Sequence, residues 1–225
     1  MCFSPEGDLV SGVVVVAIGA DACRHLEGKE EYLFVAGLPL LLGAHQIVEA
    51  FVWWGVRGSV PSAVGTVAMW IYLLFALVVL PVLGPLLVLG LERTPTRRWR
   101  IVPFVAVGAV TSGILAATML RTHPTVHEGA YHLAYSIGLQ HGVAVIGFYI
   151  VATCGSMLAS GFRHVFWFGI SNLVAIAVLA RLSADGFTSL WCFYAALASG
   201  AIALYLRIGV PRHPDAPAVA HGAPG

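Results

Sequence analysis

Long apolar runs separated by short polar loops make up most of the chain. A membrane-spanning helix needs about 20 mostly apolar residues, and seven segments are candidates: 8–25, 31–56, 63–92, 101–120, 131–160, 164–182 and 187–208. This pattern predicts an all-α fold, a polytopic bundle of seven transmembrane helices forming one domain over residues 1–209. The last stretch, 210–225, is rich in Pro, Ala and Gly and lacks apolar periodicity, which is typical of a disordered tail.

Composition supports the same class. Hydrophobic residues make up 59% of the chain and charged residues only 10%, whereas soluble domains carry about 25% charged residues. The net charge of +1 leaves no basic face of the kind that nucleic-acid binding requires. We therefore expect membrane lipid as the surrounding partner and no nucleic acid.

The basic residues predict an orientation, because Lys and Arg concentrate in cytoplasmic loops. With seven helices, the loops after the first, third and fifth helices share one side with the C-terminal tail. That side holds most of the cations: Arg24, Lys29, Arg93, Arg97, Arg98, Arg100, Arg163, Arg207 and Arg212. The opposite loops hold only Arg57, Arg121 and Arg181. The N-terminus is therefore expected outside and the tail in the cytoplasm.

Glu49 is the most informative polar residue, since it lies midway along the second segment, one helical turn after His45. A charged side chain at bilayer depth costs at least a few kcal/mol, so such residues face the bundle interior and mark ion paths, proton relays or metals. Residues four apart share a helical face, which suits two metal ligands or a base with its orienting carboxylate. A polar pair that only joins helices is the simpler alternative, although Gln or Ser would serve there without a charge.

Further candidates fall in the same outer half of the predicted bundle. His132 and His141 both belong to the fifth segment, half a turn out of phase, with His141 deeper and His132 at the mouth. Cys2 and Cys192 lie on the oxidising side, where a disulfide could join them. Alternatively, their thiolates could help the histidines and Glu49 bind zinc, copper or iron.

Three motifs together resemble a family of small bacterial multi-span membrane proteins that begin Met-Cys-Phe-Ser and have no assigned function. They are the opening Met1-Cys2-Phe3-Ser4, the intramembrane His45-Gln46-Ile47-Val48-Glu49, and Ser189-Leu190-Trp191-Cys192-Phe193. The resemblance implies a shared fold and outer site, in a protein of the bacterial inner (plasma) membrane. The family pattern has Gln-Gln-x-x-Glu-Gly at the second motif, where this chain has His45 and Ala50 instead of the first Gln and the Gly.

A looser architectural similarity links the chain to the alkaline ceramidase and adiponectin-receptor superfamily of zinc-dependent membrane hydrolases. Those proteins carry His-x-x-x-His on the last helix and Ser-x-x-x-His on the second. Here the seventh segment offers Cys192, and Leu41 stands four residues before His45. The similarity therefore concerns architecture alone.

These patterns favour an integral-membrane enzyme, a hydrolase or oxidoreductase, that acts on a lipophilic or small substrate. Its catalytic residues would be Glu49, His45 and His141. Its transition metal would be held by ligands drawn from six residues: His45, Glu49, His132, His141, Cys192 and Cys2. Two alternatives stay open, a proton-coupled carrier that titrates Glu49 and a non-catalytic receptor or assembly subunit.

Overall fold

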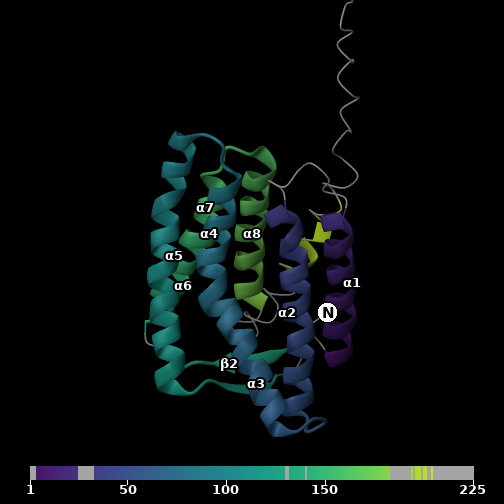
Figure 1. Ribbon diagram of the computed structural model, residues 1–225. Coiled ribbons are helices and arrows are strands. Elements are labelled where there is room, and N and C mark those ends of the chain that lie inside the picture. The colour runs from purple at the N-terminus through teal and green to yellow at the C-terminus, as the bar shows by residue number, and fades with distance from the viewer. Residues whose placement is uncertain are drawn as a thin grey trace, which may run out of the picture.

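The computed structural model is mostly helical (Figure 1). It describes residues 4–24, 33–129, 132–139 and 141–182, together with 194, 196–198, 200, 201 and 204. Four helices are uninterrupted: α1 (Pro5–Arg24), α2 (Leu33–Val56), α5 (Pro95–Thr122) and α8 (Arg163–Leu182). Two composite rods combine α-helix with π-helix. The first consists of α3 (Ser62–Leu73), η2 (Leu74–Val79) and α4 (Leu80–Leu91), and the second of α6 (Gly142–Ile150), η3 (Val151–Gly155) and α7 (Ser156–Leu158).

The first four predicted segments and the sixth are helical, whereas the prediction of one helix over 131–160 is wrong. A β-hairpin, β1 (Thr125–Glu128) and β2 (Leu133–Ser136), occupies the start of that segment, so the fold is not purely α-helical. Gly138 and His141 both have positive φ, a conformation that a right-handed helix cannot include, and α6 begins only after them. Most of the seventh predicted segment and the tail at 210–225 lie outside the described residues.

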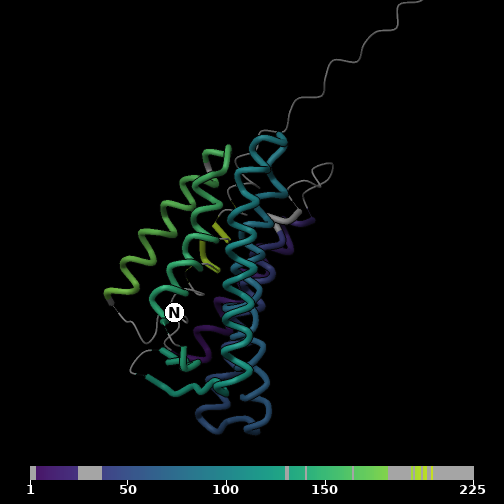
Figure 2. The backbone as a smooth tube through the Cα atoms, turned by 90° about the vertical axis from the view of Figure 1, so that its left-hand side faces the viewer, coloured from purple at the N-terminus to yellow at the C-terminus, as the bar shows by residue number. Residues whose placement is uncertain are grey.

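The hairpin lies across one end of the helices, and the turn between α4 and α5 lies at the other end (Figures 1 and 2). Two continuous helical segments, Ser62–Leu91 and Pro95–Thr122, are long and apolar enough to cross a membrane. Large apolar side chains also project from the surface of the described helices, among them Val67, Val110 and Val174. The described bundle thus has an apolar exterior.

Glycines set the spacing of the first three helices. In the antiparallel pair α1 and α2, a Cβ added to Gly12 would lie 2.7 Å from the carbonyl oxygen of Gly43. Between α2 and α3, a Cβ added to Gly65 would lie 2.6 Å from the Cα of Gly55. Contacts this short are possible only between residues without side chains, so backbones approach closely at both places.

The π-helical segment η2 joins α3 to α4 and lies beside α5 and α6. A π-turn loosens the regular hydrogen-bond ladder and leaves carbonyls that need other donors. The Ser112 hydroxyl of α5 donates to the carbonyl of Val78 at 2.6 Å, and the Tyr149 hydroxyl of α6 donates to the carbonyl of Ala76 at 2.8 Å. These two hydroxyls tie η2 to α5 and α6.

Candidate functional site

Glu49 is completely buried in the C-terminal half of α2. Its helical neighbours on the inward face, Gln46 and Trp53, are buried as well, with 0% and 1% of their surfaces exposed. These buried residues form one stripe along α2, because residues three and four apart lie on the same face of a helix. The expectation that Glu49 faces the interior agrees with this burial.

Two tyrosine rings from other parts of the fold connect His45 to Glu49. The imidazole of His45 stacks on Tyr72 of α3 at 4.1 Å with an interplanar angle of 9°. Tyr72 in turn stacks on Tyr135 of β2 at 4.9 Å. The Tyr135 hydroxyl donates to Oε1 of Glu49 at 3.4 Å, which is long for an O–H···O bond. His45 and Glu49 are thus joined both along α2 and across the Tyr72–Tyr135 stack.

Several buried polar atoms of this site have no hydrogen-bond partner among the described residues. They are Nε2 of His45, both amide atoms of Gln46 and Nε1 of Trp53. Buried polar groups are satisfied in the great majority of native structures, and an exception calls for an explanation such as strain, a catalytic role, or a bound water or ion. The site can therefore offer both hydrogen-bond donors and acceptors to a polar ligand.

Asp8 of α1 is a buried carboxylate that the sequence analysis did not single out. Gly12, one turn later in α1, packs on Gly43 and Ile47 of the antiparallel helix α2. Because the two helices are antiparallel, the residue one turn before Gly12 in α1 lies level with residues about one turn after this contact in α2. Asp8 therefore lies near the level of Glu49. Asp8 and Gly12 share the buried face of α1, and their four-residue spacing is the signal that the sequence itself contains.

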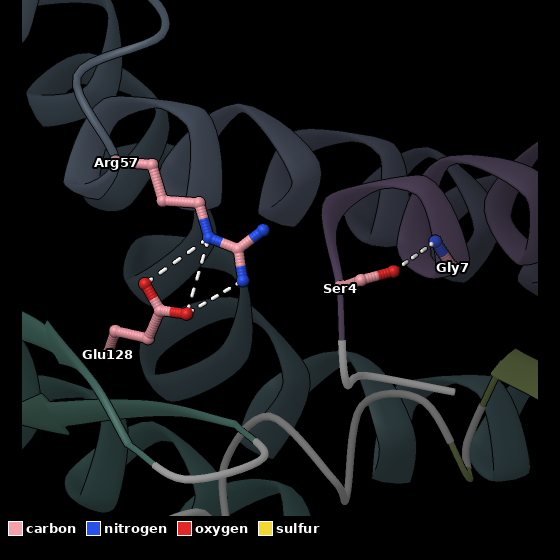
Figure 3. Close-up of polar contacts among 4 residues, drawn as sticks. All are labelled: Ser4, Gly7, Arg57 and Glu128. Atoms are coloured by element: carbon pink, nitrogen blue, oxygen red, sulfur yellow. Dashed lines mark hydrogen bonds and ion pairs between the residues drawn. The ribbon is translucent and has the colours of Figure 1, made fainter.

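The hairpin end of the site is held by an ion pair (Figure 3). Arg57, directly after α2, meets Glu128 of β1 with 2.7 Å between Nη2 and Oε1, and its guanidinium lies 4.8 Å from the ring of Trp53. The hydrogen bond from Arg57 lowers the pKa of Glu128 below its usual value, and the same bond raises the pKa of Arg57. Figure 3 also shows Ser4, whose hydroxyl accepts the N–H of Gly7 at 3.1 Å in the first turn of α1.

The other predicted ligands do not assemble around Glu49 in the described residues. His132 is half-buried in the hairpin beside Gly129, and His141 is exposed at the start of α6, not deep in a helix as predicted. Within the described ranges, no three His, Cys, Asp or Glu side chains are close enough to hold a metal ion. Cys2 and Cys192 lie outside the described residues, so their predicted proximity stays a prediction.

An apolar groove of about 410 Å³ runs between α2 and α3 on the outer face of this helix pair. Its lining is aliphatic and aromatic: Val48, Phe51, Ala63, Val64, Val67, Ala68 and Ile71. Val48 precedes Glu49 in α2 and also packs against the buried cluster that contains Tyr72. The groove thus lies beside the wall of the polar site.

A family profile described as "Family of unknown function (DUF6629)" matches residues 1–219. No curated protein and no solved structure matches the chain in the same comparisons. The family match agrees with the resemblance to proteins without an assigned function. No relationship to alkaline ceramidases or adiponectin receptors emerges.

Proposed function

The chain belongs to this family of unknown function, and from the site alone we propose that it is an integral-membrane enzyme whose acid–base catalysis centres on Glu49. Its substrate is a lipophilic or small molecule, and hydrolysis is the reaction class that fits best. The observation that carries the proposal is the enclosure of Glu49 and His45 with the hydroxyl of Tyr135 inside an apolar bundle.

The membrane placement is part of the proposal. The two long apolar helical segments and the apolar side chains on the exterior support it, because large exposed apolar surfaces are rare on soluble proteins. We place the chain in a bacterial inner membrane as a multi-span protein with seven helices and its N-terminus outside. In this orientation the hairpin and Glu49 belong to the outer half.

The catalytic step follows from the groups present. The Glu49 carboxylate removes a proton from a water molecule as that water attacks the substrate carbonyl, and the same proton then passes to the leaving group. The Tyr135 hydroxyl orients Glu49, and Nε2 of His45 offers a second hydrogen bond to the reacting groups. The hydrogen bond from Tyr135 to Glu49 is 3.4 Å long, which fits this role because catalytic hydrogen bonds are often long before substrate binds. The apolar groove between α2 and α3 supports a lipophilic substrate.

This site could bind a transition metal only if a residue outside the described ranges supplied a further ligand. His45 and Glu49 supply two donors, and no third His, Cys, Asp or Glu joins them within the described part of the chain. Cys2 or Cys192 would have to complete the set for zinc, copper or iron. Elemental analysis of the purified protein and of its Cys2→Ser and Cys192→Ser variants tests this directly.

The catalytic proposal is tested with protein reconstituted in liposomes. Turnover is measured on a panel of lipophilic esters and amides by mass spectrometry of the products. We expect Glu49→Gln to lower turnover by at least about 100-fold, because general acid–base groups contribute about 10²–10⁴ in rate. Glu6→Gln is the matched control, since it neutralises an exposed carboxylate in the first turn of α1. Wild-type turnover in Glu49→Gln would refute the proposal.

The same liposomes separate the enzyme from the carrier. A proton-coupled carrier moves protons across the vesicle wall together with its substrate, which a pH-sensitive dye inside the vesicle records. An enzyme moves no protons across the wall, and the proton released by ester hydrolysis appears only together with the carboxylate product. Proton flux that depends on Glu49 without turnover would therefore favour the carrier.

A further inference from the structure

The end of the bundle opposite the hairpin carries a group of exposed arginines. Arg97, Arg98 and Arg100 belong to the first two turns of α5, and Arg163 is the first residue of α8. All four side chains are exposed. We call these four residues the arginine cluster.

Contacts at this end bring α5 and the start of α8 together. The carboxylate of Glu92, at the end of α4, accepts the hydroxyl of Ser160 at 2.8 Å and the N–H of Gly161 at 2.6 Å. Gly161 also lies directly against Arg97, so a Cβ there would overlap the guanidinium group. Figures 1 and 2 both show the first turn of α5 and the α7–α8 turn at the same end.

The charge of the cluster is not neutralised by acidic side chains in the described residues. Arg97, Arg98, Arg100 and Arg163 form no ion pair there, and the ion pair of Arg57 with Glu128 lies at the opposite end. Glu92 is only 2% exposed and already accepts two hydrogen bonds. The arginines therefore present an uncompensated positive surface.

Trp99 adds a second, independent feature. It is 73% exposed although it lies between Arg98 and Arg100 on α5. An exposed indole beside cations is typical of residues at the level of lipid headgroups, where the ring is half solvated and its N–H finds a partner. Arginine is well suited to phosphate because its planar fork forms paired hydrogen bonds with phosphate oxygens.

We propose that the arginine cluster binds the phosphate groups of anionic phospholipids in the cytoplasmic leaflet, with Trp99 at headgroup depth. The inference rests on the membrane placement proposed above but not on catalysis at Glu49. A lipid surface fits better than a free phosphate ion because the arginines extend along two helices beside an exposed indole. Phosphatidylglycerol is the probe of choice, since it carries one phosphate and one negative charge.

The test uses the full chain purified in detergent and titrated with phosphatidylglycerol or with zwitterionic phosphatidylcholine. Native mass spectrometry counts the bound lipids. We expect the wild type to prefer phosphatidylglycerol, and the combined variant Arg97→Gln, Arg98→Gln, Arg100→Gln to lose that preference by about ten-fold. The single variant Arg121→Gln is the matched control, because Arg121 is an exposed arginine at the opposite end of the same helix.

Two further measurements separate a loss of lipid binding from misfolding and from a failure to insert into the membrane. A triple Arg→Lys variant at the same positions keeps the charge but not the paired hydrogen bonds, so its preference should lie between those of the wild type and the Gln variant. Alkaline extraction and unfolding of both variants then exclude misfolding as the cause of the loss. Extraction of vesicles at alkaline pH reports membrane insertion separately. An inserted Gln variant with wild-type preference, or an equal loss in Arg121→Gln, would overturn the lipid inference while leaving the catalytic proposal intact. A wild type that is fully extracted would overturn the membrane placement itself.

Discussion

Substituting Gly55 with Ala tests whether the close contact of α2 with α3 holds the candidate site together. A Cβ on Gly55 would overlap the Cα of Gly65, where ordinary van der Waals contact needs at least 3.4 Å. The two helices must then move apart by roughly 1 Å at this point. Such overpacking costs about 1–3 kcal/mol, and the higher helix propensity of Ala returns about 0.5–1 kcal/mol. We expect a net loss of about 1–2 kcal/mol.

The matched control is Gly113→Ala in α5. A Cβ at Gly113 meets no atom within 4 Å, so only the propensity term acts and the variant should gain about 0.5–1 kcal/mol. Thermal and denaturant unfolding in the same detergent, followed by circular dichroism, measures both variants. Equal stabilities of the two variants would refute the packing argument.

Gly55→Ala should also disturb the candidate site, which begins two turns after Gly65 along α3. Tyr72 stacks on His45 at 4.1 Å, and the displacement of α3 would weaken this contact. The imidazole protons of His45 should then move toward ordinary chemical shifts, because the ring current of Tyr72 no longer acts on them fully. An NMR spectrum of histidine-labelled protein, with His45→Gln for assignment, records the change. An unchanged signal in Gly55→Ala would show that the stack does not depend on the glycine contact.

Two further predictions concern the polar contacts around the site. Tyr149→Phe removes the hydroxyl that donates to the carbonyl of Ala76 in η2 and should lower stability by about 1 kcal/mol, up to about 3 kcal/mol if that carbonyl stays unpaired; equal unfolding midpoints would contradict this. Because Arg57 holds the pKa of Glu128 below its usual 4.5, their ion pair contributes fully above that value and is lost as the pH falls through the lowered pKa. Proteolysis of the hairpin should therefore accelerate below that pH in the wild type, whereas Arg57→Gln should show the faster cleavage already at neutral pH.

The sequence correctly predicted those features that depend only on residues close together along one helix. Apolar segment length predicted helices at the first four and the sixth positions, and the cost of a buried charge predicted that Glu49 faces inward. The pairing of His45 with Glu49 on one face followed from helical periodicity. These inferences needed only the chain's local geometry.

The hairpin shows where local pattern fails. An apolar run such as 131–160 has no periodicity that separates a strand from the start of a helix. The structure divides it because Gly138 and His141 take positive φ and β2 pairs with β1. As a result, His132 and His141 do not line a helix together.

The sequence alone determined the apolar class of the chain and the inward stripe of α2, because both arise from residue type and helical period. Only the tertiary structure decided which groups meet Glu49. Tyr135 is distant along the chain and reaches Glu49 through the hairpin, and Asp8 comes to its level through the Gly12 and Gly43 contact. The register between segments depends on side-chain volume at a few crossing points, and a glycine in the sequence does not say which backbone it will touch.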